Sequence, residues 1–177
     1  MWDSFNTYGG SYQNSFETLC NQLFERYLSK EYPNSIDEFK VINGAGGDGG
    51  IEAYGKLSNG NFIAIQSKWF KQALDSNELN QIKKSITTAL NIRPSIIEYI
   101  ICIPHNVSSV KIGKGKKPTQ NSEDVRIKNF EKEIKESLPN VKITWWFEHS
   151  ILEELQRPEN EGVHKYWFER ERIHSSF

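Results

Sequence analysis

Apolar residues recur along this chain at two spacings, which predict helices and strands in alternation. Steps of three and four residues over 16–28, 79–90 and 125–138 predict amphipathic helices, each with one face on a core. A short helix is expected over 150–155. Short apolar runs bounded by turn residues predict strands. The expected strands are 39–42, 51–57, 62–70, 96–103 and 141–147.

The order of these elements predicts an α/β fold. A helix comes first, then three strands that begin as an antiparallel meander, and then helix, strand, helix and strand. This order favours a mixed β-sheet flanked by helices on both faces. The dipeptide Asn59-Gly60 is typical of a hairpin turn, so strand 62–70 should return antiparallel to strand 51–57.

Length and composition narrow the class of protein. A chain of 177 residues with 37% hydrophobic and 25% charged residues is typical of one globular domain, which we expect over 1–157, with a tail or linker over 158–177. Cys20 and Cys102 each lie in an apolar run, which favours buried thiols in a reducing compartment and a cytoplasmic location. No apolar run is long enough to suggest a membrane role. A net charge of −1 argues against general polyanion binding but permits a local basic patch.

Two short segments on either side of the predicted hairpin carry the candidate chemistry. Gln66 and Lys68 share one face of a strand, and a lysine at the end of a buried strand needs a nearby carboxylate. Asp48 and Glu52, in and just after a glycine-dense turn, can supply it. A hard cation such as Mg²⁺ prefers oxygen ligands, here a carboxylate, the Gln66 amide oxygen and the Ser67 backbone carbonyl. The pattern therefore predicts a metal site suited to a phosphodiester.

The register of the hairpin decides whether this site can form. A two-residue loop would place Ala53 opposite Gln66 and turn Glu52 away, whereas a three-residue loop would bring Glu52 opposite Gln66 or Lys68. We therefore predict an odd-numbered turn or a bulge near Gly55.

A resemblance to a known family rests on these same residues. Gly47-Asp48-Gly49-Gly50-Ile51-Glu52, followed by Gln66-Ser67-Lys68 and preceded by a helix that opens Phe16-Glu17-Thr18-Leu19, resembles the Mrr-like branch of the PD-(D/E)xK nuclease superfamily over 15–104. The resemblance implies a restriction-endonuclease-like fold and Mg²⁺-dependent hydrolysis of double-stranded DNA, with Mn²⁺ as a substitute.

The resemblance also implies roles for single residues. Gln66 matches the glutamine that replaces the acid of the lysine motif in that branch, and Glu17 matches the acid of the first helix. Glu52 stands where the family most often has aspartate, which leaves open whether Asp48, Glu52 or both hold the metal. Similar domains often form N-terminal effectors of bacterial antiphage proteins fused to a nucleotide-dependent sensor module. A homo-oligomer is therefore a further expectation, since such a domain can require oligomerisation by a partner or by the fused sensor before it cuts. The segment 158–177 would then be such a junction.

Each candidate also has a plainer interpretation. Glu17 lies three residues after Asn14, a spacing that suits a capping box. Asp48 could cap a turn, and Glu52 with Lys68 could form an ordinary cross-strand ion pair.

The segment 111–117 is a basic loop that either contacts DNA phosphates or is only solvated. Its lysines are Lys111, Lys114, Lys116 and Lys117. Two alternative functions remain open: a catalytically silent nucleic-acid-binding module with the same fold, and a structure-selective junction nuclease.

Overall fold

A five-stranded mixed sheet forms the centre of the computed structural model, which describes residues 1–42, 49–107 and 122–169. The strands lie in the order β1-β2-β3-β4-β5; β2 pairs antiparallel with both β1 and β3, whereas β4 pairs parallel with both β3 and β5. The predicted α/β class with an antiparallel meander is confirmed. The strands are β1 (Ile36–Val41), β2 (Ala53–Leu57), β3 (Phe62–Ser67), β4 (Ile96–Cys102) and β5 (Lys142–Trp146).

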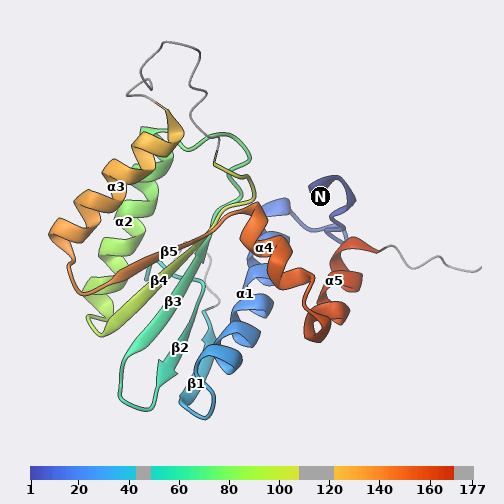
Figure 1. Cartoon of the computed structure of the whole chain (residues 1–177), viewed down its shortest axis with the longest axis horizontal. Coiled ribbons are helices and arrows are strands. Elements are labelled where there is room, and N and C mark those ends of the chain that lie inside the picture. Colours follow the sequence, from blue (N-terminus) through green and yellow to red (C-terminus); the bar gives the residue numbers. More distant parts are fainter. Residues whose placement is uncertain (43–48, 108–121, 170–177) are drawn as a thin grey trace, which may run out of the picture.

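Helices cover both faces of the sheet, as the order of elements predicted. In Figure 1, α2 and α3 lie on one face, and α1, α4 and α5 lie on the other. Helices α2 and α3 are also the crossovers that make the last strand pairs parallel, since a parallel connection needs a long return path. The helices are α1 (Tyr12–Glu31), α2 (Ser76–Ile92), α3 (Glu123–Ser137), α4 (Glu148–Leu155) and α5 (Glu161–Phe168), with short 3₁₀ turns η1 (Trp2–Ser4) and η2 (Pro158–Asn160).

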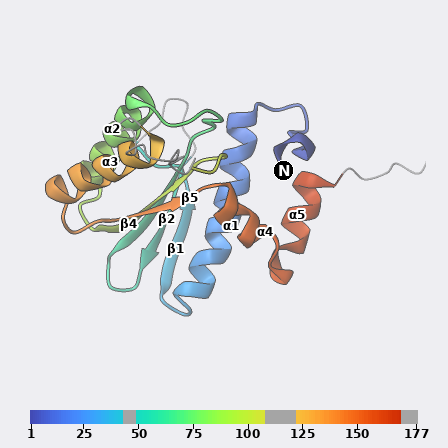
Figure 2. The same cartoon turned by 45° about the horizontal axis from the view of Figure 1, so that its top comes forward.

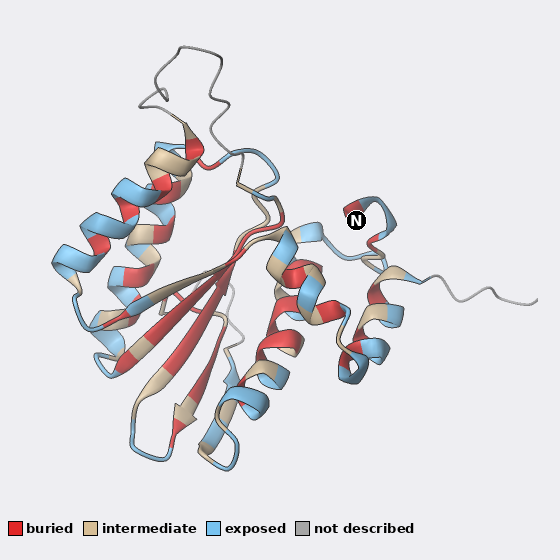
Figure 3. Ribbon diagram, in the orientation of Figure 1, coloured by how far each residue is buried: buried red, intermediate tan, exposed pale blue. Residues whose placement is uncertain are grey.

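The sheet separates two hydrophobic cores. One core joins α1 to its face of the sheet through Phe16, Leu23 and Ile65, and the other joins α2 and α3 through Ile82 and Phe130. The turned view in Figure 2 shows the two helical layers on opposite sides of the strands. Figure 3 shows buried residues along the central strands and on the helix faces turned toward them. The layers therefore hold the ends of β2 and β3 in fixed positions.

The hairpin between β2 and β3 has the three-residue loop that the site requires. Leu57 N–H donates to the Asn61 carbonyl (2.8 Å), which leaves residues 58–60 as the loop. Gly60 has φ +89°, a left-handed conformation that glycine adopts readily. Ala53 pairs with Ile65 and Tyr54 with Ala64, a register that continues toward Glu52 opposite Gln66. The prediction of an odd-numbered turn is confirmed.

The segment 158–169, expected as a tail or linker, packs on the rest of the fold. Val163 and Trp167 are buried in the core formed with α1, and the Trp167 indole N–H donates to Gln22 Oε1 (2.8 Å). The core of the fold therefore continues beyond residue 157.

Two further expectations concern thiols and membranes. Cys20 and Cys102 are both buried and form no disulfide, as predicted. Among the described residues, no helix combines the length and the hydropathy needed to cross a bilayer.

Candidate functional site

Strand β3 ends in a polar segment that is largely buried. Gln66 is only 2% exposed, and its amide oxygen Oε1 has no hydrogen-bond partner in the described part of the chain. Ser67 is fully buried, and the backbone N–H of Lys68 donates to the Cys102 carbonyl (3.0 Å), which extends the pairing with β4. A buried amide oxygen without a donor is costly, so an ordered water molecule or an ion is expected to satisfy it.

Glu52 meets this segment from the start of β2. Its carboxylate oxygen Oε2 accepts a hydrogen bond from the Ser67 N–H (3.0 Å), while its own N–H donates to the Ile65 carbonyl (2.9 Å). The regular strand begins only at Ala53. The Glu52 carboxylate therefore accepts the Ser67 N–H in place of the backbone carbonyl that would continue the β2–β3 pairing. This hydrogen bond holds the carboxylate against the end of β3.

Electrostatic interactions connect Glu52 to two other predicted residues. The pKa of the Glu52 carboxyl is raised from its ordinary value of 4.5 to about 8, first by burial and second by the Glu17 carboxylate. The Ser67 N–H and the Lys68 ammonium act in the opposite direction and lower the pKa of Glu52, but they do not cancel the effect of burial. Glu17 and Lys68 are thus close enough to affect the ionisation of Glu52 at the end of β3.

Lys68 makes no ion pair with any carboxylate in the three described stretches of the chain. The cross-strand pair between Glu52 and Lys68 that the sequence allowed is not formed as a direct contact. The ammonium is partly exposed at the strand end, where it remains available to a phosphate or a water molecule.

Glu17 is not a helix cap. Helix α1 begins at Tyr12, and its N-cap is Ser11, whose hydroxyl accepts from the Asn14 N–H (3.1 Å). The capping-box interpretation of Glu17 is wrong, because the helix starts one turn earlier than that spacing assumed. Glu17 Oε1 instead accepts a hydrogen bond from Gln13 Nε2 (2.7 Å).

Gln13 is the site residue that the sequence analysis missed. Its amide nitrogen donates both to Glu17 and to the Ser67 carbonyl (3.0 Å), and its amide oxygen accepts from the Trp69 N–H (2.7 Å). One side chain of α1 thereby fixes the acid of the first helix against the end of β3. The one signal in the sequence is the four-residue step from Gln13 to Glu17, which places both on one helix face.

Gly50, two residues before Glu52, packs closely against α2. Gly50 has φ +71°, and a Cβ at this position would lie 2.0 Å from the Ser85 carbonyl oxygen of α2. The buried Tyr99 hydroxyl donates to the Gly50 carbonyl. Glycine is therefore required where the chain passes against α2, just before Glu52.

Two sets of predicted residues lie outside the described part of the chain. These are Asp48, and the basic loop residues Lys111, Lys114, Lys116 and Lys117. The described residues contain no group of three or more histidine, cysteine, aspartate or glutamate side chains placed to hold a metal. A metal at the end of β3 would thus be held by Glu52, the Gln66 amide oxygen and the Ser67 carbonyl, with Asp48 as a further predicted ligand.

The oxygen donors that the structure describes here suit a hard cation. Such ions prefer carboxylate, amide and carbonyl oxygens to nitrogen or sulfur. No described donor satisfies the Gln66 amide oxygen, so a cation could take the place of that donor. A cation near Glu52 would also offset the repulsion between the Glu52 and Glu17 carboxylates. Magnesium or manganese fits this set of donors.

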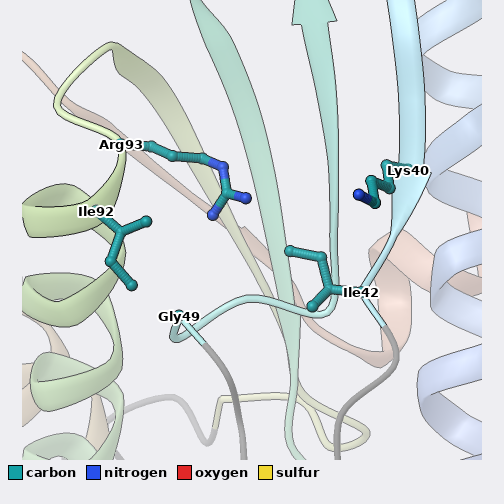
Figure 4. A pocket seen from close by; sticks show the side chains of 5 residues that line it. All are labelled: Lys40, Ile42, Gly49, Ile92 and Arg93. Atoms are coloured by element: carbon teal, nitrogen blue, oxygen red, sulfur yellow. The ribbon is translucent and has the colours of Figure 1, made fainter.

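A hollow with two cations lies between the end of β1 and the end of α2, and is lined by Lys40, Ile42, Gly49, Ile92 and Arg93. It measures about 280 Å³, and Ile42, which lines it, donates its N–H to the Glu52 carbonyl (2.7 Å). Figure 4 shows the Lys40 ammonium and the Arg93 guanidinium directed toward each other across the hollow. The Arg93 guanidinium lies 4.7 Å from the centre of the Tyr54 ring. Neither cation forms an ion pair with the carboxylates that the structure describes.

Comparisons with known proteins assign no family to the chain. No protein-family model matches it, and a comparison with curated proteins finds no significant match.

Proposed function

We propose that this chain is a metal-dependent endonuclease that hydrolyses phosphodiester bonds of double-stranded DNA, in the manner of the Mrr-like nucleases that it resembles. One observation carries the proposal. The buried Gln66 amide oxygen has no hydrogen-bond donor among the residues that the structure describes, and it lies on a strand end that also holds Lys68 and binds the Glu52 carboxylate. A buried polar side chain beside a carboxylate and a lysine is costly at the end of a central strand unless a ligand compensates for it.

The side chains divide the work of hydrolysis between them. Glu52 and the predicted ligand Asp48, with the Gln66 amide oxygen and the Ser67 carbonyl, would hold Mg²⁺ or Mn²⁺. When bound, such an ion lowers the pKa of water and offsets charge on the phosphate. Lys68 orients the attacking water and stabilises negative charge that develops on the phosphate oxygens.

Glu17 supports this centre from α1. Gln13 holds the Glu17 carboxylate beside the end of β3, where it can accept a proton from water or assist the ion. The raised pKa of Glu52 implies that cation binding at neutral pH releases a proton, because a carboxylate ligand must be ionised.

Cations beside the centre support DNA as the substrate. The hollow lined by Lys40 and Arg93 could hold a phosphate neighbouring the scissile one, since two cations face it that form no ion pair with a described carboxylate. The loop lysines of 111–117 remain a further predicted contact. A cellular role in antiphage defence or restriction, joined to a nucleotide-dependent sensor module and activated by oligomerisation, follows from the resemblance.

Plasmid cleavage tests the proposal. The purified chain is incubated with supercoiled plasmid and Mg²⁺ or Mn²⁺, beside Lys68→Ala and Glu52→Gln. Lys30→Ala is the matched control, because Lys30 is an exposed lysine at the far end of α1. We expect metal-dependent nicking by the parent and the control and at least a hundredfold slower nicking by the two site variants.

Metal binding is measured as well, because a domain that needs an activator would not cut plasmid on its own. Calorimetric titration with Mn²⁺ should show one site in the parent and a weakened site in Gln66→Ala. If the parent neither nicks plasmid nor binds Mn²⁺, the proposal is refuted. DNA binding without metal-dependent cleavage, even by protein oligomerised through a fused module, would favour the catalytically silent alternative.

A further inference from the structure

Two aromatic rings form a stacked pair beside the candidate site. The rings of Tyr12 and Trp69 are nearly parallel, with an interplanar angle of 4° and 5.1 Å between centroids. Tyr12 is 51% exposed, although aromatic side chains of this size usually bury most of their surface. Tyr12 therefore leaves about half of its surface to solvent, although its ring lies against Trp69 and near Phe5, at 6.4 Å between centroids.

Hydrogen bonds join this pair to the site. The Trp69 N–H donates to Gln13 Oε1 (2.7 Å), and the same Gln13 side chain contacts Glu17 and the Ser67 carbonyl. Tyr12 directly precedes Gln13, and Trp69 directly follows Lys68. The two rings thus come from the two elements that also supply the candidate catalytic groups.

Packing behind the pair keeps it in place. The Trp69 ring meets Trp2 edge-on, at 5.3 Å and 87°, and meets Phe16 at 5.2 Å and 62°. Trp2 and Phe16 are buried core residues. Trp69 is therefore a fixed support, and a ligand that stacks on Tyr12 would not need to order the rings first.

Charge near the pair favours a nucleic acid. Lys71 lies 5.8 Å from the centre of the Trp69 ring, is exposed, and forms no ion pair with a carboxylate of 1–42, 49–107 or 122–169. Exposed polar residues, Ser11 and Asn14, flank Tyr12. A stable protein interface needs about 800 Å² of contact from each partner, which one exposed ring with polar neighbours does not offer. One nucleobase with its phosphate matches a single ring beside a single cation.

We propose that Tyr12, supported by Trp69, stacks on an unpaired DNA base next to the scissile phosphate, and that Lys71 contacts the phosphate of that nucleotide. This inference rests on the proposed function and adds a substrate preference to it. DNA with an unpaired or unstacked nucleotide at the cleavage position should be bound better than continuous duplex. A base in an intact stack cannot offer its face to Tyr12.

Binding without divalent metal tests the preference separately from catalysis. The probes are a short duplex and the same duplex with one unpaired thymidine, at the same salt concentration and in EDTA. We expect the parent to bind the unpaired probe about 5- to 150-fold more tightly, the range that stacking of one base supplies. Tyr12→Ala should lose this ratio, and Tyr12→Phe should keep it because the ring remains.

Two further variants separate stacking from charge and from general surface effects. Lys71→Ala should weaken binding to both probes and reduce the salt dependence by about one phosphate contact. Tyr166→Ala is the matched control, since Tyr166 is also 51% exposed and stacks on another tyrosine, Tyr8. It should bind as the parent does.

Several outcomes would overturn the inference. If Tyr12→Ala keeps the preference for the unpaired probe while circular dichroism shows a folded chain, the Tyr12 ring does not stack on a DNA base. If Tyr12→Ala changes only the oligomeric state, the ring is a protein contact. If the parent prefers intact duplex, or binds neither probe in EDTA, the inference fails, and plasmid nicking with metal decides separately on the proposed nuclease.

Discussion

The free energy of unfolding of the metal-free chain should decrease as pH rises from about 4.5 to about 8. Over this range Glu52 keeps its proton in the folded state and loses it in the unfolded state, because its pKa is raised on folding. The folded state binds more protons, so each added pH unit favours the unfolded chain. Stability from this group is thus complete at low pH and lost as pH approaches 8.

The size of the effect follows from the shift in pKa. A change from 4.5 to about 8 corresponds to at most about 5 kcal/mol, at 1.36 kcal/mol per pH unit. Water entry beside a partly buried carboxylate lowers the cost of desolvation, so we expect about 2 to 5 kcal/mol. This is a large part of the stability of a single domain.

Urea unfolding at a series of pH values, with EDTA present, measures the effect in three proteins. Glu52→Gln keeps an oxygen for the Ser67 N–H but has no charge to bury, so its stability relative to the parent should rise with pH by up to about 1.4 kcal/mol per unit. Glu25→Gln is the control, because Glu25 is an exposed glutamate of α1. It should follow the parent.

Parallel curves for the parent and Glu52→Gln would refute the reasoning, since they would show that Glu52 ionises alike in both states. A parent that gains stability relative to the variant as pH rises would refute it more strongly. Added Mg²⁺ at pH 8 should stabilise the parent and leave Glu52→Gln nearly unchanged, because only the carboxylate binds the ion well.

Two further predictions concern the surroundings of the site. Gly50→Ala should lower the free energy of unfolding, measured by urea denaturation, by about 2 to 5 kcal/mol. The backbone of Gly50 is left-handed, and a Cβ there would lie 2.0 Å from the Ser85 carbonyl oxygen. Gly60→Ala should lose only about 1 kcal/mol, since its φ is +89° with no atom within 4 Å; equal losses would contradict the close approach. Lys40→Ala and Arg93→Ala should each reduce the slope of log Kd against log salt by about 1 for metal-free DNA binding. Unchanged slopes would show that no phosphate occupies the hollow.

Much of the fold was predictable from local patterns. The helical stripe that begins at Phe16 and the apolar start of β3 fixed element types, because these depend on neighbours within a few residues. The end of the fold was missed at 158–168. Val163 and Trp167 are spaced for one helix face, but a single pair four residues apart is too short a pattern to separate a packed helix from a tail.

The sequence alone determined most of the secondary structure and the antiparallel start of the sheet, because periodicity and turn chemistry act over short distances. It also singled out Glu52, Gln66 and Lys68, and the family resemblance added Glu17. Only the tertiary structure decided that Gln13 holds Glu17 to Ser67, that the Gln66 oxygen is buried without a donor among the described residues, and that the pKa of Glu52 is raised to about 8. Gln13 and Ser67 are 54 positions apart. Burial and charge interactions of this kind depend on distances between remote segments, which packing of α1 against β3 sets.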